Sequence, residues 1–388
     1  MNIEKLKFYV DNWYEYIEKK NIELLEKEIG MSFKDFVIEI LGNVYNEYKD
    51  IIRFIPVSKD NCSEYIIKPQ NGRYSLEDFL INRLLRNISM IKYQEQYFMS
   101  ESNYDHTYGE VLLDKERLQM HLKDVGQKRK LVAHELLHGL KTQFIDNNIF
   151  RSEEYFKLKE RIKRQRIEEV NDFNYNVGYG QNGLYSHCGL TPNQRYLKLI
   201  NASSQSFDTE NLDEIFNELD AIRASKDTYK EVKQFNNGLC VIIKNPESSN
   251  AYITNYAYIM ERLLDKETLF AGMYIDPQMM FDQINKLYTD IFQKQYNSNK
   301  TALEIIAEQL NFIKKNPTAT DAHEKLLTTL YECINRKDVL NNYNAQIRDN
   351  NITCLGNNGL LEIVNGRLKI YSNLAYADEY ESVRNKSK

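Results

Sequence analysis

Two histidines four residues apart, with a glutamate beside the first, are the part of this sequence best suited to chemistry. Residues 131–140 read LVAHELLHGL, in which His134, Glu135 and His138 have the spacing H-E-x-x-H. On a helix, residues i and i+4 point the same way, so both imidazoles can reach one Zn²⁺ at about 2.0–2.1 Å. The glutamate can take a proton from a water whose pKa the ion lowers to about 7. The spacing therefore predicts a zinc site that activates water for attack on a carbonyl.

A third zinc ligand is expected from a later helix. The segment LDEIFNELDA places Glu214 and Glu218 four residues apart, on one helical face. Catalytic zinc sites use three protein ligands and keep a further position for water. Each of the two glutamates is therefore a candidate third ligand.

These two segments resemble the gluzincin branch of the zincin metallopeptidases. Its members carry H-E-x-x-H on one helix and N-E-x-x-x-D on a later one. Residues 213–218, DEIFNE, fit the second pattern with Asp for Asn and Glu for Asp, and they are similar to the L-x-E-G-x-x-E helix of zincin-like bacterial proteins. Ile215 stands where that helix has Gly. The resemblance covers roughly residues 100–275.

The resemblance implies a role for each of these side chains. The implied zinc ligands are His134, His138 and Glu214, with Glu135 as the general base. Glu218 would orient a ligand histidine, and its exchange with Glu214 as the third ligand stays open. A metzincin extension is excluded, because Lys141 and Phe144 stand where that branch has Gly and His.

A peptidase also needs a donor for the oxyanion of the tetrahedral intermediate, and gluzincins commonly use a Tyr or His after the third ligand. The segment NAYITNYAYIMERLL offers Tyr256 and Tyr258 as candidates, although aromatic residues at helical spacing are more often core. His323 is a more distant option on a polar stretch, where a surface position is expected.

The remaining candidates favour ordinary structural roles. His187 and Cys188 lie in a Gly-rich segment that reads as a loop, and a second metal site there is the less favoured interpretation. His106 is expected on a solvated loop. The basic run KLKERIKRQR (157–166) is interleaved with Glu and favours a solvated helix face.

The elements that position these residues indicate an α+β, mostly helical protein. Residues 1–54 carry helical periodicity, and further helices are expected at 75–91, 123–145, 212–227, 251–265, 277–296 and 302–316, with Ser32 and Ser75 as N-caps. The segment YGEVLLDKERL (108–118) reads as a strand, expected at the sheet edge where zincins hold extended substrates. Two turn signals, NNG and NG, predict a terminal β-meander.

Three regions are expected from these patterns. Residues 1–95 would form a helical N-terminal cap, residues 96–345 a zincin-like catalytic region with a small mixed sheet and a helical C-terminal lobe, and residues 346–388 the meander and tail. An insert at 150–205 is the least readable part, in which a charged helix and then a Gly/Asn-rich loop are expected.

The composition limits the partners and the compartment. The net charge of −5 gives no reason to expect nucleic acid, and no apolar run is long enough to cross a membrane. The N-terminal residues lack a secretory signal, and five scattered cysteines without C-x-x-C favour a reducing compartment. A cytoplasmic protein is expected, and export without a classical signal peptide is the alternative.

The function that these observations favour is a zinc-dependent peptidase acting on a peptide or protein substrate. Endo- and exopeptidase activity both stay open, as does the oligomeric state. The first alternative is a non-catalytic zincin-like binding module, in which retention of Glu135 would have no purpose. The second is a helical binding protein in which HELLH is a coincidence.

Overall fold

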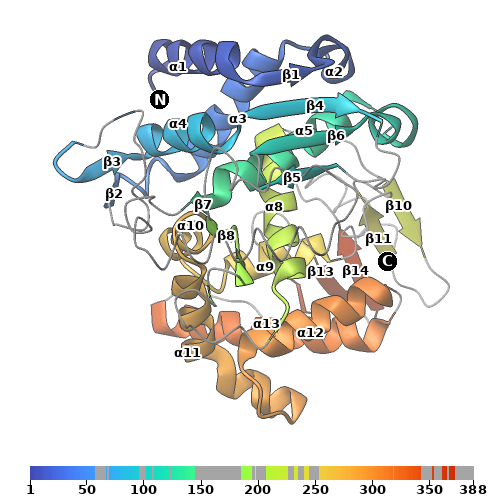
Figure 1. Cartoon of the computed structure of the whole chain (residues 1–388). Helices are drawn as coiled ribbons and strands as arrows, with labels where there is room; N and C mark the ends of the chain where they lie inside the picture. The colour runs from blue at the N-terminus through green and yellow to red at the C-terminus, as the bar shows by residue number, and fades with distance from the viewer. Residues whose placement is uncertain are drawn as a thin grey trace, which may run out of the picture. The chain divides into compact units, whose positions relative to one another are not determined.

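The computed structural model describes residues 1–56, 67, 70–95, 102–106, 109–122, 124–144, 185–194, 197, 207–225, 231–234, 240–243, 253–317, 319–341, 352–353, 361–364 and 367–371. The chain forms two compact units, and Figure 1 labels helices and strands of both. The first comprises Met1–Ser204, Arg223–Ser225 and Met273–Ile275, and the second comprises Gln205–Ile222, Lys226–Gly272 and Asp276–Lys388. The three regions predicted from the sequence, with boundaries at residues 95 and 345, stay a prediction, because the two units are a division of another kind.

The first unit contains the N-terminal helices, the motif helix and three small sheets. Its helices are α1 (Ile3–Tyr16), α2 (Ile22–Ile29), α3 (Phe33–Tyr48), α4 (Leu76–Asn87), the π-helical turn η1 (Arg117–His121) and α5 (Val125–Lys141). Its strands are β1 (Glu18–Lys20), β2 (Phe54–Pro56), β3 (Arg73–Ser75), β4 (Met90–Gln94), β5 (Asn103–Asp105), β6 (Glu110–Asp114), β7 (Thr142–Phe144), β8 (Tyr185–Cys188) and β9 (Thr191–Pro192).

Side-chain caps set where three of these helices begin. Ser32, Ser75 and Asp124 each accept a hydrogen bond from the backbone N–H three residues later, at 3.1, 3.1 and 2.8 Å. Such caps satisfy an N–H group that the helix itself leaves without a partner. The two serine caps predicted from the sequence are therefore confirmed.

The main sheet of this unit has the order β1-β4-β6-β5. Strands β1, β4 and β6 run parallel, and β5 pairs antiparallel with β6. The strand expected at 108–118 is present as β6, but the prediction that it lies at the edge is wrong. Among the described strands, β5 is the edge on that side.

The segment after α4 also differs from the prediction. The helix expected over 75–91 ends at Asn87, and Met90–Gln94 form β4 instead. Ile91 and Tyr93 are fully buried, while Met90, Lys92 and Gln94 are half-buried. This alternation is typical of a strand with one face on the core.

Helix α5 packs closely against its neighbours in the first unit. A Cβ built on Gly139 would lie 2.8 Å from Ile88 Cγ1 and 3.2 Å from Tyr104 Cε2 of β5. Only glycine allows this approach without a shift of those side chains. The helix is buried on several faces, including polar residues such as Gln127, Lys130 and Lys141. It is therefore an interior helix, which agrees with a role in positioning a site.

The second unit is mainly helical. Its helices are α8 (Glu210–Ser225, whose last three residues belong to the first unit), α9 (Thr254–Glu261), α10 (Lys266–Tyr274, whose end also belongs to the first unit), α11 (Pro277–Tyr296), α12 (Ala302–Lys315) and α13 (Thr320–Asn341). Its strands are β10 (Glu231–Gln234), β11 (Cys240–Ile243), β12 (Ile352–Thr353), β13 (Leu361–Val364) and β14 (Arg367–Tyr371). The predicted meander is present, because β12, β13 and β14 are successively antiparallel, and β11 extends it in parallel with β14.

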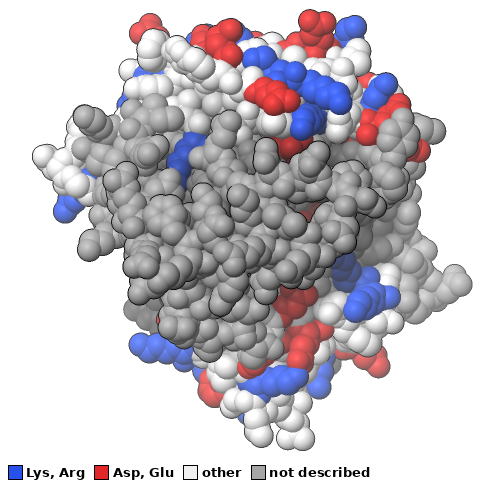
Figure 2. All heavy atoms as spheres, viewed as in Figure 1, with Lys and Arg blue, Asp and Glu red and all other residues white. Residues whose placement is uncertain are grey.

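The α+β class with a predominance of helix and a small mixed sheet is thus confirmed. No helix in the described part of the chain is long and apolar enough to cross a membrane. Figure 2 shows basic and acidic side chains interspersed over the described surface on one face. Most of the 150–205 insert, including the basic run 157–166, lies outside the described residues.

Candidate metal centre on helix α5

The two motif histidines converge on one side of α5. Nε2 of His134 lies 3.1 Å from Nε2 of His138, and the ring planes are 79° apart. Two nitrogens that bind one tetrahedral ion at 2.0–2.1 Å lie about 3.3 Å from each other. Both imidazoles therefore present the same nitrogen at nearly the separation that a shared zinc ion requires.

Burial distinguishes this pair from histidines on a solvated helix face. His134 is 8% exposed and Glu135 is 4% exposed, whereas His138 is half-buried. Burial strengthens the interactions of a charged or metal-bound group, because less water screens them. The glutamate is placed one residue from the first histidine, as the sequence predicted, with its carboxyl group inside the protein.

Buried side chains from α4 hold the C-terminal end of α5. The Asn87 side-chain amide donates hydrogen bonds of 2.8 Å to the carbonyl oxygens of Gly139 and Thr142. Arg83 donates to the Thr142 carbonyl as well, to the side chain of Gln143, and to the Tyr274 carbonyl at 2.8 Å. Burial lowers the pKa of Arg83 to about 9. These donors satisfy carbonyls that a helix end leaves unpaired, and they fix the turn that follows His138.

The segment read as a Gly-rich loop forms a hairpin beside this turn. Strand β8 pairs antiparallel with β7, so that Cys188 stands opposite Thr142 and His187 opposite Gln143. The Cys188 sulfur lies 3.7 Å from Nδ1 of His138 and 3.3 Å from the His138 carbonyl oxygen. The loop prediction is wrong for Tyr185–Cys188, which form a strand. The sequence therefore did not indicate that the Cys188 thiol is buried beside a candidate metal ligand.

His187 has a different environment from its neighbour Cys188. Its Nδ1 lies 3.0 Å from the Gly189 carbonyl oxygen and its Nε2 lies 2.8 Å from the Ile275 carbonyl oxygen. Burial lowers the pKa of His187 to about 4. Both ring nitrogens thus face backbone carbonyls, which indicates a structural residue.

Two tyrosine rings lie beside His106, which was predicted from the sequence to be on a solvated loop. The His106 ring lies 5.0 Å from the Tyr104 ring and 4.5 Å from the Tyr185 ring, centroid to centroid. Burial, and next to it the charge of His138, lowers the pKa of His106 to about 3. The Tyr104 hydroxyl donates to the Asn87 carbonyl at 2.6 Å. His106 therefore lies on a turn directly after β5, as a loop position predicts, but it is half-buried rather than solvated.

The candidate third ligands lie on α8, mostly in the second unit. Glu214 is half-buried and Glu218 is 8% exposed. The helix continues without a break into the first unit, where the Ala224 carbonyl accepts a hydrogen bond of 2.6 Å from Asn43. Glu214 precedes Ala224 by ten residues, about 15 Å along the helix axis.

The predicted oxyanion donors lie on α9. Tyr256 is fully buried, and its hydroxyl lies 2.8 Å from Nδ1 of His323. His323 Nε2 lies 3.0 Å from the Pro317 carbonyl oxygen. The expectation that His323 is a surface residue is wrong, because it is fully buried on α13. Tyr258 also lies on α9, and its side chain is outside the described part of the chain.

No protein-family model, curated protein or solved structure matches the chain. The assignment of a function therefore depends on the residues themselves and on their geometry.

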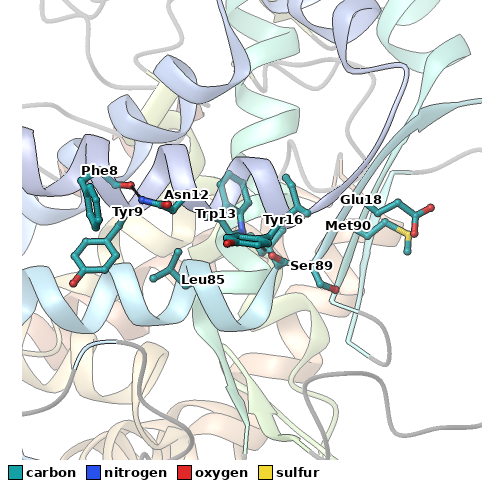
Figure 3. Close-up of a pocket in the computed structure, with 11 residues that line it drawn as sticks. Phe8, Tyr9, Asn12, Trp13, Tyr16, Glu18, Leu85, Ser89 and Met90 are labelled. Atoms are coloured by element: carbon teal, nitrogen blue, oxygen red, sulfur yellow. Dashed lines mark hydrogen bonds between the residues drawn. The ribbon is translucent and has the colours of Figure 1, made fainter.

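A separate groove of about 780 Å³ lies between α1 and α4 in the first unit (Figure 3). Figure 3 shows Tyr9, Trp13 and Tyr16 of α1 along its length, with Leu85 of α4 facing them. The Trp13 indole donates to the Ile88 carbonyl at 2.8 Å. None of the motif residues lines this groove, so it is distinct from the histidine pair.

Proposed function

We propose that the chain is a zinc-dependent peptidase whose ion is held by His134, His138 and Glu214. The observation that carries the proposal is the 3.1 Å approach of the two Nε2 atoms on α5, with Glu135 buried beside them. Two groups of described side chains could hold a metal ion, namely His134, His138 and Glu214, and His138, Cys188 and Asp213, so His138 belongs to both. A pair of imidazoles and a carboxylate is a donor set that catalytic zinc sites use.

Each residue of this chain has a defined task in the proposed reaction. Zinc bound there supplies a water of lowered pKa and a positive charge near the substrate carbonyl. Glu135 accepts the proton of the attacking water and returns it to the leaving amine nitrogen. Glu218, one turn after Glu214 on α8, orients the ligands through hydrogen bonds. Tyr258 is the remaining predicted donor to the oxyanion, because the Tyr256 hydroxyl already contacts His323.

The edge strand β5 supports a peptide as the substrate. It is the last strand of its sheet among those described, and it lies against α5 through the Tyr104–Gly139 contact. A strand with one free edge can hold an extended peptide by main-chain hydrogen bonds. The substrate-binding edge predicted for β6 is therefore assigned to β5 in this proposal, because β6 lies inside the sheet.

The first test is the metal content of the purified full-length protein, together with hydrolysis of a peptide library. We expect one zinc per chain and cleavage of a subset of peptides. Glu135→Gln should keep the zinc and slow turnover by about 10²- to 10⁴-fold, since the base is lost while the ligands remain. Zinc without hydrolysis in the wild type would support the binding module instead. Absence of zinc after reconstitution would reduce the motif to a coincidence.

The third ligand is tested by comparing Glu214→Ala with Glu218→Ala. We expect Glu214→Ala to lose the zinc and Glu218→Ala to keep most of it. The reverse result would exchange their roles. Equal retention in both variants would remove Glu214 and Glu218 from the ligand set and leave Asp213 as the carboxylate of α8 that could bind the ion.

A further inference from the structure

Cys188 contacts the candidate metal ligand His138 on the side away from its partner histidine. Nε2 of His138 faces His134, so Nδ1 is the distal nitrogen, and the Cys188 sulfur lies 3.7 Å from it. The same sulfur lies 3.3 Å from the carbonyl oxygen of His138. Cys188 is 3% exposed, and the β7–β8 pairing fixes its backbone opposite Thr142. The thiol on β8 thus contacts two polar atoms of His138, the ring Nδ1 and the backbone carbonyl oxygen.

These two contacts are complementary in their hydrogens. A neutral imidazole carries one N–H, and the nitrogen without it keeps a lone pair. If Nδ1 carries the proton, it donates to the sulfur, while the S–H donates to the His138 carbonyl. The lone pair then remains on Nε2, which faces His134. The carbonyl also accepts a hydrogen bond of 2.8 Å from the Thr142 hydroxyl, so it is held in place independently.

We propose that Cys188 is a positioning residue that holds the His138 imidazole with its proton on Nδ1 and its Nε2 lone pair directed toward His134. The inference rests on the proposed function of the histidine pair, and it adds the group that orients one ligand. Ligand histidines in metal sites generally donate their second N–H to a protein acceptor, which fixes the ring and its tautomer. Here the acceptor is a buried thiol.

A thiol differs from the other small side chains in how it can fill this position. Sulfur is larger than oxygen and makes longer hydrogen bonds, which suits a separation of 3.7 Å. Serine would retain a donor and an acceptor but would reach less far, whereas alanine would remove both and leave the Nδ1 proton without an acceptor. The expected order of effect is therefore alanine greater than serine.

The experiment uses the full-length protein and three variants. Cys188→Ala and Cys188→Ser are compared with Cys333→Ala, because Cys333 is also a buried free cysteine but belongs to α13 of the second unit. Nitrogen NMR of the imidazoles in the metal-free protein reports the tautomer of His138. Competition with a chelator reports the zinc dissociation constant. Hydrolytic activity is not needed for either readout.

We expect wild-type His138 to carry its proton on Nδ1, and Cys188→Ala to lose that preference. Zinc binding should weaken about 10- to 100-fold in Cys188→Ala, less in Cys188→Ser, and by less than about twofold in Cys333→Ala. A general loss of packing would affect Cys333→Ala as strongly, so this control separates orientation from stability.

Three results would overturn the inference in distinguishable ways. If the wild type binds zinc and Cys188→Ala binds it equally well with the same tautomer, Cys188 has no positioning role and the proposed function stands. If the Co²⁺-loaded wild type shows a thiolate-to-cobalt charge-transfer band that Cys188→Ala lacks, Cys188 is a ligand rather than a positioning residue. If the wild type binds neither metal, the proposed function fails and the inference fails with it.

Discussion

The motif histidines of the first unit and His323 of the second unit have opposite surroundings. In the second unit, both nitrogens of His323 have protein partners, because Nδ1 accepts from the Tyr256 hydroxyl and Nε2 donates to the Pro317 carbonyl. In the first unit, His134 and His138 direct the same nitrogen toward each other at 3.1 Å. At most one proton can lie between those two atoms.

Burial alone does not separate these two environments. His323 is fully buried and His134 is 8% exposed, so both lie inside the protein. The difference lies in the partners of each nitrogen. A histidine whose two nitrogens are satisfied in this way has no lone pair to offer, whereas two ring nitrogens that face each other at 3.1 Å can share a proton or a cation. His187 differs from His323, because both of its ring nitrogens face backbone carbonyls and a neutral imidazole donates to only one of them.

The largest expected effect comes from replacing one histidine of each kind, the candidate ligand His138 and the buried His323, by alanine. Loss of a residue that orients a ligand weakens metal binding by up to about 100-fold. His138→Ala should weaken zinc binding by more than that, because a ligand itself is removed. His323→Ala should leave zinc binding unchanged and lower the free energy of unfolding by about 2–5 kcal/mol, since it opens a cavity and leaves the Tyr256 hydroxyl unpaired. Chelator competition and urea unfolding measure the two quantities. Equal zinc affinities in both variants would remove the distinction.

The sequence predicts the histidine pair on α5 but not the contact of His138 with Cys188. The spacing of His134, Glu135 and His138 is local, and a helix converts it directly into a shared face. The helix was predictable for the same reason, as was α11, whose bounds agree with the prediction. Cys188 and His138 are 50 residues apart, and their contact depends on the pairing of β7 with β8, whose register no local pattern encodes.

The errors in the fold have a similar cause. Strands β1 and β4 pair in parallel across about 70 residues, and β1 reads Glu-Lys-Lys, which carries no apolar alternation. The first residues of α13 are polar, so the sequence did not indicate a buried helix there. Tertiary packing decides which side of this helix is buried, and that side includes His323. Sequence periodicity identifies an amphipathic element, but not a short strand completed by a distant partner.

The second expected effect is a pH dependence of stability from His323. Burial lowers its pKa to about 4 in the folded protein, against about 6.5 for an unperturbed histidine. The unfolded chain therefore binds more protons between these values. The contribution of His323 is complete above pH 6.5, is lost as the pH falls toward 4, and amounts to about 3 kcal/mol at most.

Urea unfolding of the wild type and of His323→Gln at pH 7, 6, 5 and 4 measures this contribution. The difference between the two proteins should shrink as the pH falls through this range. A difference that stays constant from pH 7 to 4 would show that His323 is not held in its neutral form by the fold.

The third expected effect concerns the packing that holds the motif helix. Gly139→Ala would place a Cβ 2.8 Å from Ile88 and should lower the free energy of unfolding by about 1–3 kcal/mol. The matched control is Gly42→Ala in α3, where nothing lies within 4 Å of the new Cβ and stability should rise by about 0.5–1 kcal/mol. The fluorescence of Trp13, the single tryptophan, reports unfolding of the first unit.

The smallest expected effect decides between two roles for Tyr256. Its hydroxyl contacts His323 Nδ1 at 2.8 Å, so Tyr256→Phe should leave that nitrogen unpaired and lower the free energy of unfolding by about 1–2 kcal/mol. Zinc affinity and turnover should stay as in the wild type, because the hydroxyl serves the interior of the second unit. If turnover instead slowed by about 100-fold or more while stability stayed unchanged, Tyr256 would be the oxyanion donor that its place after the third ligand suggests. In that case the Tyr256–His323 contact would be broken during turnover, and His323 would no longer be an example of a purely structural histidine.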